Sequence, residues 1–533
     1  MSPRKWSRGR SLPVSGPVSS YDAVIVGGGV GGAMAAHVLV NAGMRVALLE
    51  RGPRLTRSPE NAHPDSALEL SPYYSHESAL LVQGDDRGTM GTLQVVGGPA
   101  VFYGGVALRM RESDFEPCPE ALGEDAASWP IRYGELEPFY VEAEWLLGVA
   151  GRQHPDDPWR SAPYPWRVPE VAGPTVRLWR TATEMGMNPR HLPLAIDFDG
   201  AAGPGCERCG SCDGYACAVG AKREPASALI AHLESKGLDL RPETVVTRLL
   251  RRGTRVVGVM CVNRATGRTE VVRGDQIVLA AGALGSPHLV RSSAIDASSS
   301  ARAWVGRGLM RHCNGILFGL FPRPLEGGRA FHKQMVLFDH YAGSDGAPLG
   351  TIQSIHPPPP GLVRARLPRP LHGLEEWIAD RSTGLLVIAE DQPRRENRVE
   401  PHPRRTDRFG VPRVVVTHRH TWRDASVRRD LGRVARAVLR RAGAVVTQGV
   451  RIKTFSHALG TLRMGDDPSR CPTDRNGRLR GSDNVWVVDG SALPRSGGVN
   501  PSLTIAANAL RVAAGIGRGV AATTAVARAE PVR

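Results

Sequence analysis

Two glycine-rich segments near the C-terminus contain polar side chains that could take part in catalysis. The first reads HALGTLRMG and begins at His457, and the second reads GGVNPSLT and contains Asn500. Because imidazole titrates close to neutral pH, His457 suits the role of a general base. Asn500 stands directly before Pro501, where an asparagine could equally serve as a helix cap. The glycines of both segments would let the backbone pass close to a bound ring system.

A third segment, near the N-terminus, has the pattern of a phosphate-binding loop. An apolar run over 23–26 is followed by G-x-G-x-x-G at Gly27, Gly29 and Gly32, then by a helical stretch and a strand that ends at Glu50. Gly27 permits a tight turn, Gly29 lets the backbone approach a pyrophosphate, and Gly32 lets the helix pack against the strand. The helix N-terminus offers free N–H groups to phosphates, and Glu50 can accept the hydroxyls of a ribose. The segment predicts a bound dinucleotide, which could be FAD or NAD.

Four of the eight cysteines lie close together in the chain, at Cys206, Cys209, Cys212 and Cys217. Four thiolates at such spacing could hold a zinc ion or an iron–sulfur cluster. The chain lacks the second cysteine pair of a zinc ribbon, and the alternative is a cysteine-rich loop that packs beside the cofactor. We expect this loop to hold no metal, and we assign no metal ligand in the chain.

The length and charge of the chain limit its class. A chain of 533 residues is too long for one hydrophobic core, so two or more domains are expected. The net charge is +16, but the arginines are scattered and form no basic stripe, which argues against a nucleic-acid partner. No apolar run is long enough to cross a membrane, and the basic N-terminus lacks the apolar core of a signal peptide. We therefore expect a cytoplasmic protein with reduced cysteines and no membrane partner.

Local patterns indicate the elements that must position these groups. The pattern over 240–279 predicts a hairpin and then a buried strand, and 423–441 has helical periodicity. A strand at 484–488 leads into Asp489 and Gly490, and a helix from Thr504 to about Gly515 is expected to follow.

Together these motifs resemble those of the glucose–methanol–choline (GMC) oxidoreductase family over most of the chain. The two C-terminal motifs, H-x-x-G-T-x-R-M-G and V-N-P-x-x-T, are the most specific. The resemblance also includes the N-terminal fingerprint, Gly97-Gly98, Arg109, Asp114-Phe115, Trp129-Pro130, Tyr133 and the segment 305–310 with His312.

The resemblance implies an α/β fold with two parts. One is a discontinuous, Rossmann-like FAD-binding domain, and the other is an α+β substrate domain built on an antiparallel sheet. The expected segments are 21–115, 226–310 and 451–520 for the FAD-binding domain, 116–225 and 311–450 for the substrate domain, and 1–20 (disordered) and 521–533 for two tails.

The resemblance also implies FAD as the cofactor and oxidation of an alcohol CH–OH group to a carbonyl. His457 would be the catalytic base, and Asn500 would hold the hydroxyl oxygen of the substrate. Because the segment 97–103 contains no histidine, FAD would be held without a covalent bond. The implied cofactor-binding residues are Gly27, Gly29, Gly32, Glu50, Gly97, Gly98, Asp489, Gly490 and Asn500.

The expected substrate is a small polar alcohol, a sugar or glycoside, with the 6′-hydroxyl of an aminoglycoside antibiotic precursor as the specific candidate. Oxygen or another electron acceptor would reoxidise the flavin. Two alternatives remain open. One is an enzyme of the same fold with other chemistry, such as a hydroxynitrile lyase or a sterol oxidase. The other is a redox-inactive flavoprotein, against which the presence of both His457 and Asn500 argues.

Overall fold

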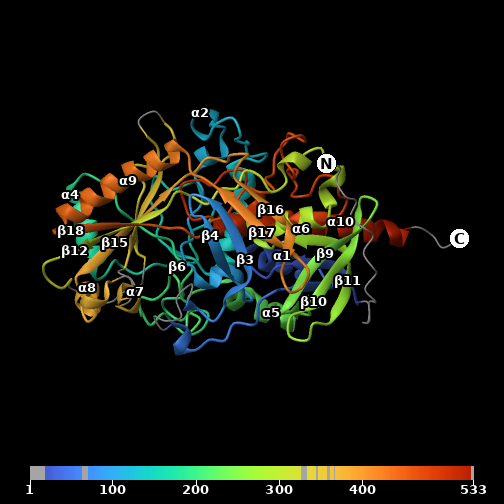
Figure 1. Ribbon diagram of the computed structural model, residues 1–533, viewed down its shortest axis with the longest axis horizontal. Coiled ribbons are helices and arrows are strands. Elements are labelled where there is room, and N and C mark those ends of the chain that lie inside the picture. The colour runs from blue at the N-terminus through green and yellow to red at the C-terminus, as the bar shows by residue number, and fades with distance from the viewer. Residues whose placement is uncertain are drawn as a thin grey trace.

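The computed structural model describes residues 19–62, 70–325, 333–343, 346–356, 360–364 and 367–529. Its strands form sheets of seven, six and four strands and a short pair, β5 (Ala150–Gly151) with β6 (Trp166–Arg167). The seven-stranded and six-stranded sheets lie at opposite ends of the molecule, with the four-stranded sheet between them (Figure 1). The predicted α/β class with two parts is confirmed. Within the described ranges, no helix combines the length and the apolar character needed to cross a membrane.

The seven-stranded sheet draws its strands from three distant parts of the chain. Its order is β8-β2-β1-β11-β10-β9, and β19 also pairs with β11. The pairs among β8, β2, β1, β11 and β19 are parallel, whereas β9, β10 and β11 form an antiparallel meander. The apolar runs of β1 and β2 are buried, as strands covered on both faces require. The bounds are β1 (Ser19–Val26), β2 (Val46–Leu49), β8 (Asp239–Arg241), β9 (Thr244–Arg252), β10 (Arg255–Asn263), β11 (Thr269–Leu279) and β19 (Val485–Val487).

Helices of this part connect and cover the parallel strands. The helix α1 (Val30–Asn41) joins β1 to β2 and packs against α10 (Ser502–Ala529), which also contacts α3 (Tyr133–Leu147). The short helix α5 (Ala231–Ser235) precedes β8, and α6 (Gly282–Ser292) follows β11.

The ends of the chain differ from the predicted tails. The helix α10 does not stop near residue 515 but continues to Ala529, so most of the expected C-terminal tail is helical. Alanine, the best helix former, recurs through this stretch and explains the extension. At the other end, residues 1–18 lie outside the described residues, and Ser19 and Ser20 already belong to β1.

The six-stranded sheet is antiparallel and has the order β18-β12-β15-β14-β13-β7. The predicted helix over 423–441 is α9 (Trp422–Arg441), which lies along this sheet (Figure 1). Thr421 and Asp424 cap its first turn reciprocally, and Val427, Leu431 and Val438 are on its buried side. The remaining bounds are β7 (Arg190–His191), β12 (Gly315–Leu320), β13 (Met335–Leu337), β14 (Gly350–Ile355), β15 (Ser382–Ala389), β18 (Val446–Arg451), α4 (Pro174–Glu184), α7 (Pro360–Arg364) and α8 (Glu375–Asp380).

The four-stranded sheet joins the two predicted domains. It has the order β16-β17-β3-β4, with β17 and β3 parallel. Its members are β3 (Tyr74–Gly84), β4 (Gly88–Leu93), β16 (Arg398–Thr406) and β17 (Pro412–His418). Since β3 and β4 come from the segment predicted for the FAD-binding domain and β16 and β17 from the substrate segment, the exact division into domains stays a proposal.

Candidate active site

The loop between β1 and α1 has the geometry that its glycines predict. Gly27 adopts a φ of +107°, and a Cβ atom there would lie 2.4 Å from the carbonyl oxygen of Ala280. A Cβ on Gly32 would lie 2.0 Å from the carbonyl oxygen of Gly27, so only glycine allows this approach of helix and strand. A Cβ on Gly29 would meet nothing within 4 Å, and no side chain caps the first turn of α1. The loop thus presents open space and unpaired helical N–H groups, as a pyrophosphate requires.

The turn at Gly97 and Gly98 lies against this loop. The N–H of Gly97 donates to the carbonyl of Gly28 at 3.1 Å, and a Cβ on Gly98 would lie 3.0 Å from Cα of Gly29. Both residues have positive φ, which their lack of a Cβ makes possible. The two glycine motifs, about seventy residues apart in sequence, therefore form one wall of the candidate cofactor site.

Glu50 is buried at the end of β2, beside the loop. Its carboxylate accepts the N–H groups of Gly28 and Gly52, each at 2.8 Å. Burial raises the pKa of Glu50, and these two backbone hydrogen bonds oppose that rise. The carboxylate keeps acceptor capacity beyond the two bonds, so the position fits ribose hydroxyls.

Asp489 anchors the turn that follows β19. Its carboxylate accepts hydrogen bonds from the N–H of Gly282 at 2.8 Å and from the hydroxyls of Ser286 and Ser491. Because these donors occupy the carboxylate, Asp489 shapes the backbone near α1. A Cβ on Gly490 would lie 2.7 Å from Leu459, so this glycine lets the turn pack against the segment that carries His457.

His457 is partly accessible and lies in a setting that keeps it neutral. Desolvation lowers its pKa to about 3, and the nearby His312 and Lys333 act in the same direction. An imidazole with so low a pKa is unprotonated at all physiological pH values. His457 is therefore available to accept a proton.

The ring of His312 determines which nitrogen of His457 is free. Its Nε2 lies 2.8 Å from the carbonyl oxygen of Gly497 and 3.2 Å from that of Ser496, and its Nδ1 lies 2.9 Å from Nδ1 of His457. Carbonyl oxygens only accept hydrogen bonds, so Nε2 of His312 carries a proton. With Nδ1 of His312 unprotonated, Nδ1–H of His457 donates to it. The side-chain amide of Asn314 also lies 3.4 Å from Nδ1 of His457, and in this tautomer its oxygen, not its nitrogen, faces His457. The lone pair of His457 is left on Nε2, which has no hydrogen-bond partner among the described residues.

Asn500 is oriented by a side chain from the six-stranded sheet. Nε2 of Gln353, on β14, donates to Oδ1 of Asn500 at 2.8 Å, and both side chains are buried. Since Gln353 donates to Oδ1, the Nδ2–H groups of Asn500 remain to donate, and they suit a substrate oxygen that gains negative charge. The helix α10 begins at Ser502, and the side-chain bond of Asn500 goes to Gln353 instead of to the first turn. This arrangement favours the binding role over the capping role.

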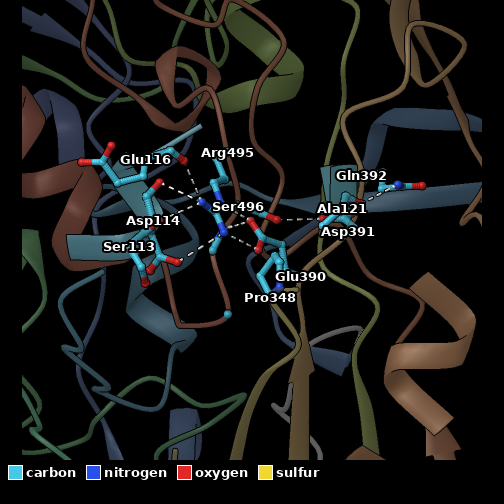
Figure 2. Close-up of polar contacts among 12 residues, drawn as sticks. Ser113, Asp114, Glu116, Ala121, Pro348, Glu390, Asp391, Gln392, Arg495 and Ser496 are labelled. Atoms are coloured by element: carbon cyan, nitrogen blue, oxygen red, sulfur yellow. Dashed lines mark hydrogen bonds and ion pairs between the residues drawn. The ribbon is translucent and has the colours of Figure 1, made fainter. Parts of the chain in front are cut away.

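A buried ion pair holds in place the segment that leads to Asn500. Figure 2 shows the guanidinium of Arg495 between the carboxylate of Glu390 and the turn at Ser113–Glu116. Nε of Arg495 donates to Glu390 at 2.7 Å, and the N–H of Gly497 donates to the same carboxylate at 2.9 Å. Because Glu390 follows β15, this network fixes residues 495–500 to the six-stranded sheet and so places Asn500 relative to His457.

The cysteine loop packs against residues 101–103, which follow the Gly97–Gly98 turn. Nζ of Lys222, fully buried, donates to the carbonyls of Tyr103, Cys212 and Tyr215 at 2.6–2.8 Å. Within this described loop, no three thiol sulfurs come within 4.8 Å of one another, and burial raises the pKa of Cys206. A cysteine-rich loop that packs beside the candidate cofactor site is one of the two alternatives that the sequence left open. That this loop holds no metal stays a prediction.

The structure brings together the residues predicted from the N-terminal and C-terminal motifs, but several partners were missed. His312 was noticed only as part of a motif, and Gln353, Glu390 and Arg495 were not noticed at all. Arg495 stands two residues before the glycine pair Gly497-Gly498, which was a possible sequence signal for it. Gln353 and Glu390 carry no local signal, because only their contacts in the folded chain define their roles.

The comparisons with known proteins agree with this geometry. Sequence profiles described as GMC oxidoreductase match residues 21–314 and 393–509. The chain belongs to the GMC oxidoreductase family. It is 32% identical to paromamine 6'-oxidase of Streptomyces fradiae, over 92% of this chain and 90% of the relative. It is 31% identical to 6'''-hydroxyparomomycin C oxidase of Streptomyces lividus, over 95% and 93% of the two chains.

Solved structures show the same GMC fold. Pyridoxine 4-oxidase from Mesorbium loti superposes with a TM-score of 0.67 at 21% identity, covering 93% of this chain and 98% of that chain. The protein is therefore an FAD-dependent oxidoreductase that acts on alcohols. The open space at Gly29, the uncapped α1 and the buried Glu50 fit this cofactor.

Proposed function

We propose that this GMC oxidoreductase oxidises the 6′-hydroxyl of an aminoglycoside precursor to a carbonyl. The observation that carries the chemistry is the contact of Nδ1 of His457 with His312 at 2.9 Å, which leaves Nε2 free, together with burial that lowers the pKa of His457. The substrate class is supported by the identity of more than 30% to two oxidases whose names refer to paromamine and 6'''-hydroxyparomomycin C.

In this proposal the residues of the chain handle the proton and the oxygen. Bound FAD, held by the loop at Gly27–Gly32 and by Glu50, supplies the two-electron acceptor for the hydride of the alcohol carbon. Nε2 of His457 takes the O–H proton as the hydride leaves, and Nδ1–H strengthens its hydrogen bond to His312 as the imidazolium forms. Nδ2 of Asn500 donates to the substrate oxygen and opposes its drift away from His457.

A carboxylate near His457 is the candidate partner for an amino sugar. Asp213 acts electrostatically on His457, and its side chain is 35% exposed and lies 2.8 Å from Nζ of Lys333. Ammonium groups of an aminoglycoside carry positive charge, and salt screens the distant part of the net charge of +16. Asp213 is shared with Lys333, so an ammonium group would compete with that cation for the carboxylate. We propose that Asp213 contributes to recognition of such a group.

The proposal extends to the electron acceptor and the location. The names of the two oxidase relatives favour oxygen over another acceptor, which stoichiometric hydrogen peroxide would test. We further propose that the enzyme works in the cytoplasm without a nucleic-acid partner, which cell fractionation and nuclease treatment of the purified protein would check.

The substrate is tested by anaerobic bleaching of the flavin. Paromamine should bleach the yellow enzyme, while the matched 6′-deoxy analogue, glucose, cholesterol and simple alcohols should bleach it far more slowly. Equal bleaching by paromamine and its 6′-deoxy analogue would contradict the site of oxidation. Bleaching by simple alcohols or cholesterol alone would contradict the substrate class.

A further inference from the structure

Three potential metal ligands converge beside the turn that carries His312. Asp391 follows β15, His418 ends β17, and His420 precedes α9. One donor atom from each lies within 4.8 Å of the other two, and Nε2 of His418 lies 3.6 Å from Oδ2 of Asp391. This is the one group of three or more such side chains found among the described residues. Two imidazoles and a carboxylate form a donor set typical of first-row divalent ions.

The buried ring of His418 lacks partners that a neutral histidine needs. Only 2% of this residue is exposed, and neither ring nitrogen has a hydrogen bond in the described structure. A buried polar group without a partner destabilises a fold, and such a group in a native protein calls for an explanation, an ion being one. Both nitrogens are available, and Nε2 already faces the carboxylate.

The local charges also favour a cation. Within the described residues, the only ion-pair contact of Asp391 is with His418. The only ion-pair contact of Asp85 in the same ranges is with His420, whose Nδ1 lies 3.4 Å from Oδ2 of Asp85. The nearby Arg311 is paired with Asp86, which also binds Arg451. Two carboxylates therefore have only histidines as ion-pair contacts, while Arg311 shares the carboxylate of Asp86 with Arg451.

We propose that Asp391, His418 and His420 bind one first-row divalent transition-metal ion, with Zn²⁺ as the probe. Ligand atoms sit about 2.0–2.2 Å from such an ion, which separates tetrahedral donors by about 3.5 Å. The 3.6 Å between Asp391 and His418 already meets this spacing, and one ring nitrogen of His420 lies within 4.8 Å of the donor atoms of both. That side chain is 10% exposed, so the ion can enter from its side.

The ion would act on the architecture of the active site. The carbonyl of His312 accepts a bond from Nε2 of His420 at 3.2 Å, and Asp391 accepts the N–H of Arg311 at 2.8 Å. Two of the three ligands thus hold the backbone around His312, a non-glycine residue with a φ of +59°. The ion braces this turn and reaches His457 only through His312. The sequence alone led us to expect no metal ligand, and these residues revise that expectation.

The test is metal uptake by the FAD-loaded enzyme after removal of metals by a chelator. Following incubation with Zn²⁺ and gel filtration, elemental analysis should find about one Zn²⁺ per chain, and Zn²⁺ should raise the thermal midpoint. His418→Phe and His420→Asn should lose both effects.

Cys209→Ser is the matched control, because exposed Cys209 belongs to the other group that could take zinc. This variant should keep the bound ion and the thermal shift. Parent enzyme that retains no Zn²⁺ would overturn the proposal, as would histidine variants that retain as much as the parent. If His418→Phe fails to fold, His420→Asn, altered at a partly exposed side chain, decides the question by the same two readouts.

Discussion

The hydrogen bond between His312 and His457 leads to a specific prediction. Replacing His312 with asparagine or with glutamine tests its two ring nitrogens one at a time, because each amide can take the place of only one of them. Asparagine can place Oδ1 near the position of Nδ1 and so keep an acceptor for Nδ1–H of His457. Glutamine reaches the position of Nε2, where it can donate to the carbonyl of Gly497, but it leaves His457 without that acceptor. We expect His312→Gln to slow flavin reduction much more than His312→Asn.

The magnitude follows from the bond that is lost. Nδ1–H of His457 donates at 2.9 Å, and this bond strengthens when the ring takes a proton and becomes charged. A hydrogen bond to a charged group contributes about 1.5–3 kcal/mol, which corresponds to about 10- to 150-fold in rate. Loss of the fixed tautomer adds to this, since His457 can then carry its proton on Nε2.

Anaerobic stopped-flow with saturating substrate measures the effect directly. FAD content and thermal midpoint serve as controls, because the φ of +59° at residue 312 is easier for asparagine than for glutamine. A folded, FAD-loaded His312→Gln enzyme that reduces its flavin at the parental rate would refute the tautomer assignment. Slowing in His312→Asn but not in His312→Gln would show that the contact with the Gly497 carbonyl, and not the acceptor, is what matters.

Other predictions concern the remaining parts of the site. Asn500→Ala should slow flavin reduction by about 10- to 150-fold and Gln353→Leu by about 2- to 10-fold; a larger effect on thermal stability than on reduction would support the capping role of Asn500. Because the pKa of His457 is about 3, the rate of flavin reduction should stay flat from pH 8 to about pH 5, and a loss centred near pH 6.5 would contradict this. The same lowered pKa makes unfolded His457 bind a proton that the folded form does not bind between about pH 3 and 6.5. Stability should therefore fall with falling pH in that window, by at most about 1.4 kcal/mol per pH unit from this residue, and less steeply in His457→Gln. Acid precipitation should release free FAD into the supernatant; flavin that stays with the pellet would indicate a covalent bond.

The sequence predicted the parts of the site that depend on local geometry. Gly27 and Gly32 have roles that any βα turn of this kind requires, so their spacing alone predicted the loop. The structure adds the close approach of Gly27 to Ala280 and of Gly32 to Gly27. His457 and Asn500 were found because each stands in a specific motif. The helix over 423–441 was found from its periodicity, since one face packs on the six-stranded sheet.

The parts that escaped prediction depend on pairing across long sequence distances. Gln353 and Asn500 are 147 residues apart, and His312 and His457 are 145 apart, so no local pattern relates them. Glu390 and Arg495 meet because β15 ends beside the C-terminal segment, a contact that neither residue's neighbours in sequence indicate. The extension of α10 was missed because its last turns lack the hydrophobic periodicity on which the helix boundary was judged.

The role of His457 as the base is tested most directly by anaerobic stopped-flow reduction of His457→Ala beside the parent enzyme, with paromamine at saturation. Both proteins should carry the same amount of FAD, since the proposed cofactor contacts lie in the loop at Gly27–Gly32 and at Glu50. Removal of a positioned base should slow flavin reduction by about 10²–10⁴-fold. Reduction of the variant at a rate close to that of the parent would contradict the assignment of His457 and with it the proposed chemistry of the site.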